Sequence, residues 1–192
     1  MNKAEIMYES KGKTLNGKPF MSVKKARFYY EYAERGGQDS IFFILYDKNI
    51  RRYALIRESK PPMDERENKK VMMTTAFGGS IDMDEKSPKE ICQIEVLEES
   101  GYEVPLDRIK YIGKTLVSSQ MSQMALGFLV DVTGINKTQK AEYEVGISEG
   151  QEAKDPDEFS RNSVIWMTSS ELIENSDWKS IFIYTKTPAE VF

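Results

Sequence analysis

Three glutamates, Glu95, Glu98 and Glu99, stand close together near the middle of the chain. At about 100° per residue, a helix would place all three carboxylates on one face. Like charges at this spacing repel each other, so bulk water, basic partners or a divalent cation must offset the repulsion. A solvated acidic surface is the general alternative. The apolar residues on the other sides of the helix, together with the glycine pair before it, favour a metal-binding catalytic helix.

The residues around the cluster predict where this helix begins and ends. Ser87 is suited to the N-cap, Pro88 to the first helical position and Glu90 to the third residue of a capping box. Gly101 is suited to the left-handed residue that ends a helix. The helix follows a β-rich apolar run that ends in a glycine pair at residues 78–79. Glycine allows backbone carbonyl groups to come close to a bound ion or phosphate.

The composition limits the chemistry that the chain can use. It has no histidine, and Cys92 is its single cysteine, which excludes imidazole ligands, His-dependent triads and an intramolecular disulfide. Carboxylates remain as the natural general bases and metal ligands, which suits Mg²⁺ or Mn²⁺. A net charge of −4 over 192 residues does not favour nonspecific nucleic-acid binding. No apolar run reaches the roughly 18 residues of a membrane span, so we expect a cytoplasmic protein with no membrane association.

The stretch over residues 78–102 resembles the Nudix box. That pattern is glycine, five residues, glutamate, seven residues, then Arg-Glu-apolar-any-Glu-Glu-any-Gly-apolar. Gly79, Glu85 and residues 95–102 follow it. Two features depart from it, because the gap after Glu85 is one residue longer and Ile94 occupies the arginine position. In the family, that arginine helps to orient the glutamate that follows.

The resemblance implies a fold, a cofactor and a catalytic set. The fold class would be α/β (α+β), a Nudix-type α/β/α sandwich with a mixed sheet and an added N-terminal β arm. A further catalytic glutamate is expected on the loop before the last strand, where Glu158 is the best match and Glu152 the second, with solvated loop charge as the alternative. Glu98 belongs to the catalytic set as well. The ligands of Mg²⁺ or Mn²⁺ would be Glu95, Glu98, Glu99 and the carbonyl of Gly78.

The chain is most similar to the ADP-ribose pyrophosphatase branch of the family, which implies a nucleotide-derived substrate. ADP-ribose, cleaved to AMP and ribose 5-phosphate, is favoured over NADH, dinucleoside polyphosphates, (d)NTPs and capped RNA ends. The expected substrate-binding residues are Arg57, Gly79, Ser119 and Met121. An exposed strand-end charge is the alternative for Arg57, and an ordinary polar hairpin is the alternative for residues 118–123. A catalytically silent Nudix domain that binds a nucleotide or a protein partner is the second hypothesis.

Apolar patterning predicts the remaining elements. Residues 1–35 are expected to form the β arm, with strands over 3–10 and 23–34, and residues 36–192 the hydrolase domain. Aromatic residues of the arm, among them Tyr30 and Tyr32, favour a homodimer contact, with an ordinary edge pair of strands as the alternative. Further strands are expected over 40–46, 52–58, 109–117, 124–132 and 163–167, loops over 59–70 and 135–162, a helix ending at 175, and a helical or mixed segment over 177–186.

Overall fold

A seven-stranded mixed sheet forms the centre of the computed structural model, which describes residues 5–12, 17–19, 21–26, 30–36, 39–139 and 163–188. The main strand order is β10-β5-β4-β9-β8, with β6 paired to β5 and β7 paired to β4. The β4–β9 pair is parallel and the other pairs are antiparallel. The strands are β4 (Ser40–Asp47), β5 (Arg52–Ser59), β6 (Met72–Thr75), β7 (Phe77–Ser80), β8 (Ile109–Leu116), β9 (Met124–Asp131) and β10 (Ser163–Met167).

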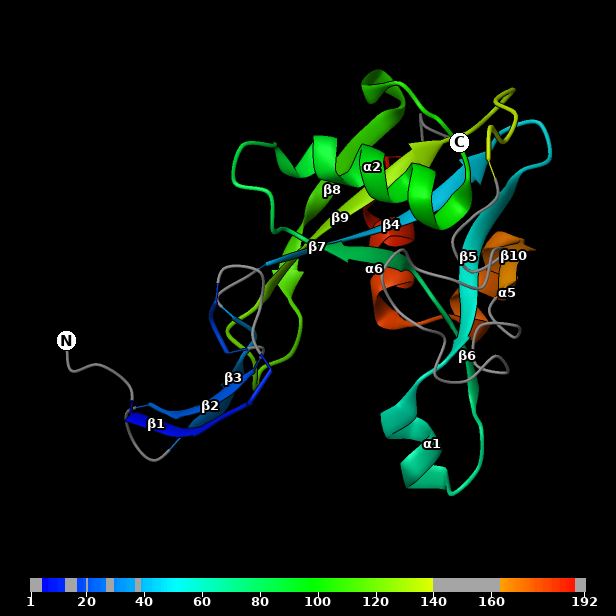
Figure 1. Cartoon of the computed structure of the whole chain (residues 1–192). Helices are drawn as coiled ribbons and strands as arrows, with labels where there is room; N and C mark the ends of the chain where they lie inside the picture. Colours follow the sequence, from blue (N-terminus) through cyan, green and yellow to red (C-terminus); the bar gives the residue numbers. More distant parts are fainter. Residues whose placement is uncertain are drawn as a thin grey trace.

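Helices cover both faces of this sheet, which makes an α/β/α sandwich (Figure 1). Because successive side chains of a strand point to opposite faces, β4 contributes to two cores. Ile41 and Phe43 pack on the side of α2 (Pro88–Ser100), whereas Phe42 and Ile44 pack on the side of α5 (Ser169–Asn175) and α6 (Trp178–Lys186). The continuous apolar run of β4 thus belongs to a strand that is buried on both faces.

The segment before the glycine pair changes strand partner part of the way along. Its first part, β6, pairs with β5, and its second part, β7, pairs with β4. Ala76 lies at the change and is buried. Because of this change, the glycine pair lies beside β4 instead of β5, and β7 contacts α2.

Residues 59–70 were predicted to form a loop, and that prediction is wrong. They contain the helix α1 (Pro61–Glu67), which begins with proline in its first turn and ends at Asn68 in the left-handed region, with φ 50°. The Asp64 carboxylate accepts hydrogen bonds from the Ser59 hydroxyl and, at 2.6 Å, from the Val71 N–H. These hydrogen bonds hold α1 against the end of β5 and the residue before β6. The polar composition of residues 59–70 did not indicate this helix.

The N-terminal region forms a separate three-stranded sheet in the order β1-β2-β3, with β1 at Glu5–Glu9, β2 at Ser22–Lys25 and β3 at Glu31–Glu34. The prediction of one long strand over 23–34 is therefore wrong, because β2 and β3 pair antiparallel. Figure 1 shows this sheet projecting away from the sandwich. It contacts the β8–β9 connection, where the Ala33 N–H donates to Gln120 O at 2.8 Å and the Tyr30 hydroxyl donates to Ser119 O at 2.7 Å.

The two C-terminal helices begin at side-chain caps. Thr168 forms a capping box with Glu171 at the start of α5, and this helix ends at Asn175, as the sequence predicted. Asp177 caps α6, and the segment expected to be helical or mixed is a helix. Within the described residues, no helix combines the length and the apolar character that a membrane crossing requires.

Candidate active site

The helix α2 begins and ends where the sequence predicted. Ser87 is its N-cap, and the reciprocal hydrogen bonds of the capping box with Glu90 are present. The Ser87 hydrogen bonds lower the pKa of the Glu90 carboxyl. Gly101 ends the helix in the left-handed region with φ 78°. Ile91, Cys92 and Val96 are buried under the helix, which fixes the direction of its remaining side chains.

Two of the three glutamates lie against the glycine pair of β7. The Gly78 N–H donates to Glu99 Oε2 at 3.1 Å. A Cβ atom on Gly79 would overlap the carboxylate of Glu95, so only glycine leaves room for that side chain as it lies. The acidic helix thus lies beside the glycine pair, as predicted. The contact between Gly78 and Glu99 is made by the Gly78 N–H, whereas the predicted metal ligand is the Gly78 carbonyl.

Glu98 differs from its neighbours in exposure, because it faces solvent whereas Glu95 and Glu99 are half-buried. Among the described residues, no three Asp, Glu, Cys or His side chains are grouped so that they could hold one metal ion. Magnesium is often bound by only one or two carboxylates, with water and substrate phosphates completing its shell. The pair Glu95 and Glu99 beside a glycine backbone fits that mode of binding.

Cys92 is buried in α2 and takes no part in this site. Burial raises the pKa of its thiol, and the nearby Glu95 and Glu99 carboxylates raise it further. A thiol with a raised pKa stays protonated at neutral pH and is a poor nucleophile. Cys92 therefore serves in the packing of α2 against the sheet.

A pocket of about 290 Å³ adjoins the glycine pair and Glu99. Three cations line it, each from a different part of the chain: Arg35 follows β3, Lys60 precedes α1, and Lys179 lies in α6. Sequence reasoning did not select any of them. The other lining residues are Ser40, Ile41, Ile56, Glu58, Ala76, Phe77 and Ser80, with Gly78, Gly79 and Glu99.

Glu58 is a further pocket residue that the sequence analysis missed. Its carboxylate accepts a hydrogen bond from the Thr75 hydroxyl at 2.8 Å and forms an ion pair with the Lys60 ammonium. The alternation of β5 was the available signal, because it places Glu58 on the same face as Ile56, which packs in the core beneath α2.

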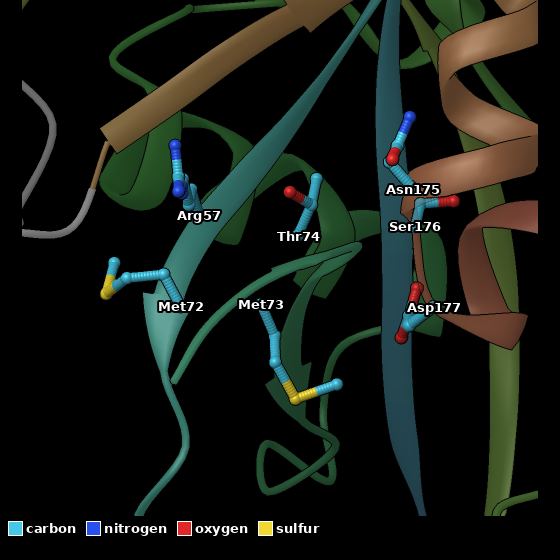
Figure 2. A pocket seen from close by; sticks show the side chains of 7 residues that line it. All are labelled: Arg57, Met72, Met73, Thr74, Asn175, Ser176 and Asp177. Atoms are coloured by element: carbon cyan, nitrogen blue, oxygen red, sulfur yellow. The ribbon is translucent and has the colours of Figure 1, made fainter. Parts of the chain in front are cut away.

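The same alternation separates Arg57 from this pocket. Leu55 packs in the core on the side of α5 and α6, so the neighbouring Arg57 belongs to that face of the sheet. Arg57 is exposed and lines a second pocket of about 440 Å³, together with Thr74 and Ser176. Figure 2 shows the seven residues that line this second pocket, none of which lines the pocket at Gly78.

Ser119 and Met121 lie at the contact with the N-terminal sheet. Ser119 accepts the Tyr30 hydroxyl through its carbonyl, and Met121 forms an isolated bridge with Ala33. Neither residue lines the pocket at the glycine pair. Glu152 and Glu158 lie outside the described residues.

Comparison with solved structures gives the class of fold. No protein-family model and no curated protein matches the sequence. One similar structure is described as an ADP compounds hydrolase; the two share 12% identity, the match covers 96% of this chain and 92% of that one, and the TM-score is 0.57. The chain has a Nudix-type fold, with the mixed sheet and flanking helices that the Nudix resemblance predicted.

Proposed function

We propose that the protein is a metal-dependent Nudix hydrolase that cleaves the diphosphate linkage of a nucleoside diphosphate joined to another group, with ADP-ribose as the favoured substrate. The observation that carries the proposal is the placement of Glu95 and Glu99 against the Gly78–Gly79 backbone, beside a pocket that three cations line. The similar structure is described as acting on ADP compounds, which supports the choice of substrate class.

The acidic and basic sides of the pocket have complementary tasks in this proposal. Glu95 and Glu99 would hold Mg²⁺ or Mn²⁺, with Glu98 and the Gly78 carbonyl as further candidate ligands. When bound, such an ion supplies charge screening and activation of water. Arg35 and Lys60 would neutralise phosphate oxygens on the other side, because cations at such oxygens stabilise the charge that develops during phosphoryl transfer.

Glu58 would position Lys60 in the pocket instead of binding the substrate or the metal ion itself. Its carboxylate is engaged by Thr75 and Lys60, so it holds the Lys60 ammonium at the wall of the pocket. Water activation falls to Glu98 or to a glutamate of the segment before β10, for which Glu158 and Glu152 are our candidates.

A substrate panel tests the reaction class. The purified protein is incubated with ADP-ribose, NADH, a dinucleoside polyphosphate, dNTPs and capped RNA, with Mg²⁺ or Mn²⁺, and products are separated by liquid chromatography. We expect ADP-ribose to yield AMP and ribose 5-phosphate. Cleavage of another compound instead would replace the substrate and keep the reaction class, whereas no cleavage with either metal would overturn the hydrolase proposal.

A silent Nudix domain is the second candidate function, and two observations favour it. Ile94 stands at the arginine position of the motif, and the described carboxylates form no group of three at one point. Calorimetry distinguishes the two functions, because a silent domain would bind ADP-ribose without converting it at any divalent ion or at alkaline pH. Turnover that disappears in Glu99→Gln would rule out the silent domain.

We also propose a cytoplasmic homodimer that uses the N-terminal sheet. Ile6 and Tyr8 of β1 are 55% and 60% exposed, and Tyr30, just before β3, is 48% exposed. Large apolar and aromatic side chains gathered in this way are typical of an interaction surface. Light scattering at micromolar concentration is expected to give twice the chain mass of 22.1 kDa. A mass near that of one chain would refute the dimer.

A further inference from the structure

Lys179 brings a cation to the pocket from the helix layer opposite α2. It lies in the first turn of α6, which packs on the other face of the sheet, and yet it lines the same pocket as Gly78 and Glu99. Its side chain is 33% exposed. Both helix layers therefore contribute to this pocket, with the Glu99 carboxylate from α2 and the Lys179 ammonium from α6.

The ammonium of Lys179 is weakly engaged compared with that of Lys60. Lys60 forms a close ion pair with Glu58, whereas the Lys179 Nζ atom lies 3.8 Å from Asp177 Oδ2, near the outer limit for an ion pair. Within the described part of the chain, the Lys179 ammonium donates no hydrogen bond. Coulomb attraction weakens with distance, so the ammonium can exchange this long contact for a closer anionic partner in the pocket.

The start of α6 is nevertheless held firmly in place by Asp177. The Asp177 N–H donates to Thr74 O at 3.1 Å, and Asp177 Oδ1 accepts the Ala76 N–H at 3.2 Å. The same oxygen accepts the Ser180 N–H at 3.0 Å and the Ser180 hydroxyl at 2.6 Å. These bonds tie the helix to the stretch that leads into the glycine pair, and so fix where the Lys179 backbone stands relative to Gly78.

Electrostatics within α6 do not explain a lysine at this position. The first turn of a helix carries a partial positive charge, which disfavours a cation there by about 0.3–1 kcal/mol. Phosphate oxygens in the adjoining pocket would reverse that cost, because they attract the ammonium and favour the same end of the helix.

We propose that Lys179 is a substrate-binding residue that contacts a phosphate of the diphosphate group, with Asp177 as the residue that positions it. The inference rests on the proposed function for the identity of the substrate, but its binding test does not depend on turnover. The ligand class is a compact dianion or polyanion with two adjacent phosphates, since the pocket holds cations from three separated elements.

Calorimetry with inorganic pyrophosphate, without divalent ions, tests the contact directly. We expect Lys179→Gln to weaken pyrophosphate binding about tenfold or more, as for the loss of a charge-assisted hydrogen bond, and Lys179→Arg to stay within about threefold of wild type. Binding by Lys179→Gln should also depend less on salt. Lys186→Gln is the matched control, because that ammonium lies in the last turn of the same helix, 5.4 Å from the centre of the Phe182 ring.

Steady-state kinetics with the substrate found in the panel provide the second measurement. Lys179→Gln is expected to lower kcat/KM about tenfold or more, with most of the effect in KM if the contact is made equally before and during the reaction. Asp177→Asn keeps a side chain that can cap the helix, so it should preserve folding and alter the salt dependence of pyrophosphate binding.

The outcomes separate this proposal from the proposed function. Turnover by the wild type together with unchanged binding and kinetics in Lys179→Gln would overturn the assignment of Lys179 and leave the hydrolase intact. Pyrophosphate binding that needs Lys179, without turnover of any compound, would support Lys179 and overturn the hydrolase. A wild-type protein that neither binds pyrophosphate nor turns over any compound overturns both.

Discussion

Replacement of Gly79 by alanine gives the most direct test of the site geometry. A methyl group there would overlap Cγ, Cδ and Oε1 of Glu95, so the glutamate must rotate away from the glycine pair. The backbone of Gly79 is not in the left-handed region, so alanine introduces no strain of its own. Gly79→Ala therefore moves a carboxylate of the proposed metal site without removing any charge.

The expected effects on stability and activity differ sharply. Forcing Glu95 off its rotamer costs about 0.5–1.5 kcal/mol, and alanine regains about 0.4–1 kcal/mol by restricting the unfolded chain. The free energy of unfolding should consequently change by less than about 1 kcal/mol. Displacement of a metal-positioning carboxylate by about 1 Å or more is expected to lower kcat about a hundredfold.

Gly134→Ala is the matched control, because its expected effects are the reverse. Gly134 has φ 72° and an added Cβ would meet no atom within 4 Å, so the cost is backbone strain of about 1–2 kcal/mol. Urea denaturation and initial rates with Mg²⁺ are measured for both variants. Gly79→Ala with a rate within threefold of wild type would refute the role of Glu95, whatever its stability.

Three further outcomes are expected. Glu99→Gln should lower kcat at least about a hundredfold, while the melting temperature of the metal-free protein stays level or rises. Glu90→Gln should change activity little. Equal rates in the wild type and both variants would refute the metal site. Hydrogen bonds from the Ser59 hydroxyl and the Val71 N–H lower the pKa of the Asp64 carboxyl. The contribution of this carboxylate to stability is therefore present above the ordinary pKa of Asp and is lost as pH falls through the lowered pKa. Urea denaturation of Asp64→Asn should thus differ from wild type at pH 7 and converge with it in strong acid; a constant difference contradicts this. Asp177→Ala should lower the free energy of unfolding by about 1–3 kcal/mol, measured by the same method, since it removes a helix cap and leaves buried donors unpaired; a change below about 0.5 kcal/mol contradicts this.

Elements with a strong local signal were predictable from the sequence. The capping box at Ser87 and Glu90, the stop at Gly101 and the apolar run of β4 each depend on residues within a few positions of one another. The proximity of Glu95 and Glu99 to the glycine pair was predictable only through the resemblance to a motif. No local sequence pattern indicates that the strand containing Gly78 and Gly79 pairs with β4.

Features that depend on tertiary contacts were not predictable in this way. Residues 23–34 contain several aromatic β-formers and neither glycine nor proline, so nothing in the sequence indicated that β2 and β3 are two antiparallel strands. Arg57 and Glu58 were both strand-end charges in the sequence, and only the register of β5 assigns them to opposite faces. Arg35 and Lys179 carry no signal near the Nudix-like stretch, because folding alone brings them to it.

The wide separation of the pocket residues along the chain has a consequence for folding kinetics. The residues that line the pocket at the glycine pair extend in sequence from Arg35, just after β3, to Lys179 in α6. The parallel pairing of β4 with β9 is also a contact between segments that are distant in the sequence. Contacts of this kind form late, because the chain loses much entropy before they stabilise it. In a refolding experiment, helical signal should return before pyrophosphate affinity does, since α2 can form locally but the pocket is complete only when α6 has docked.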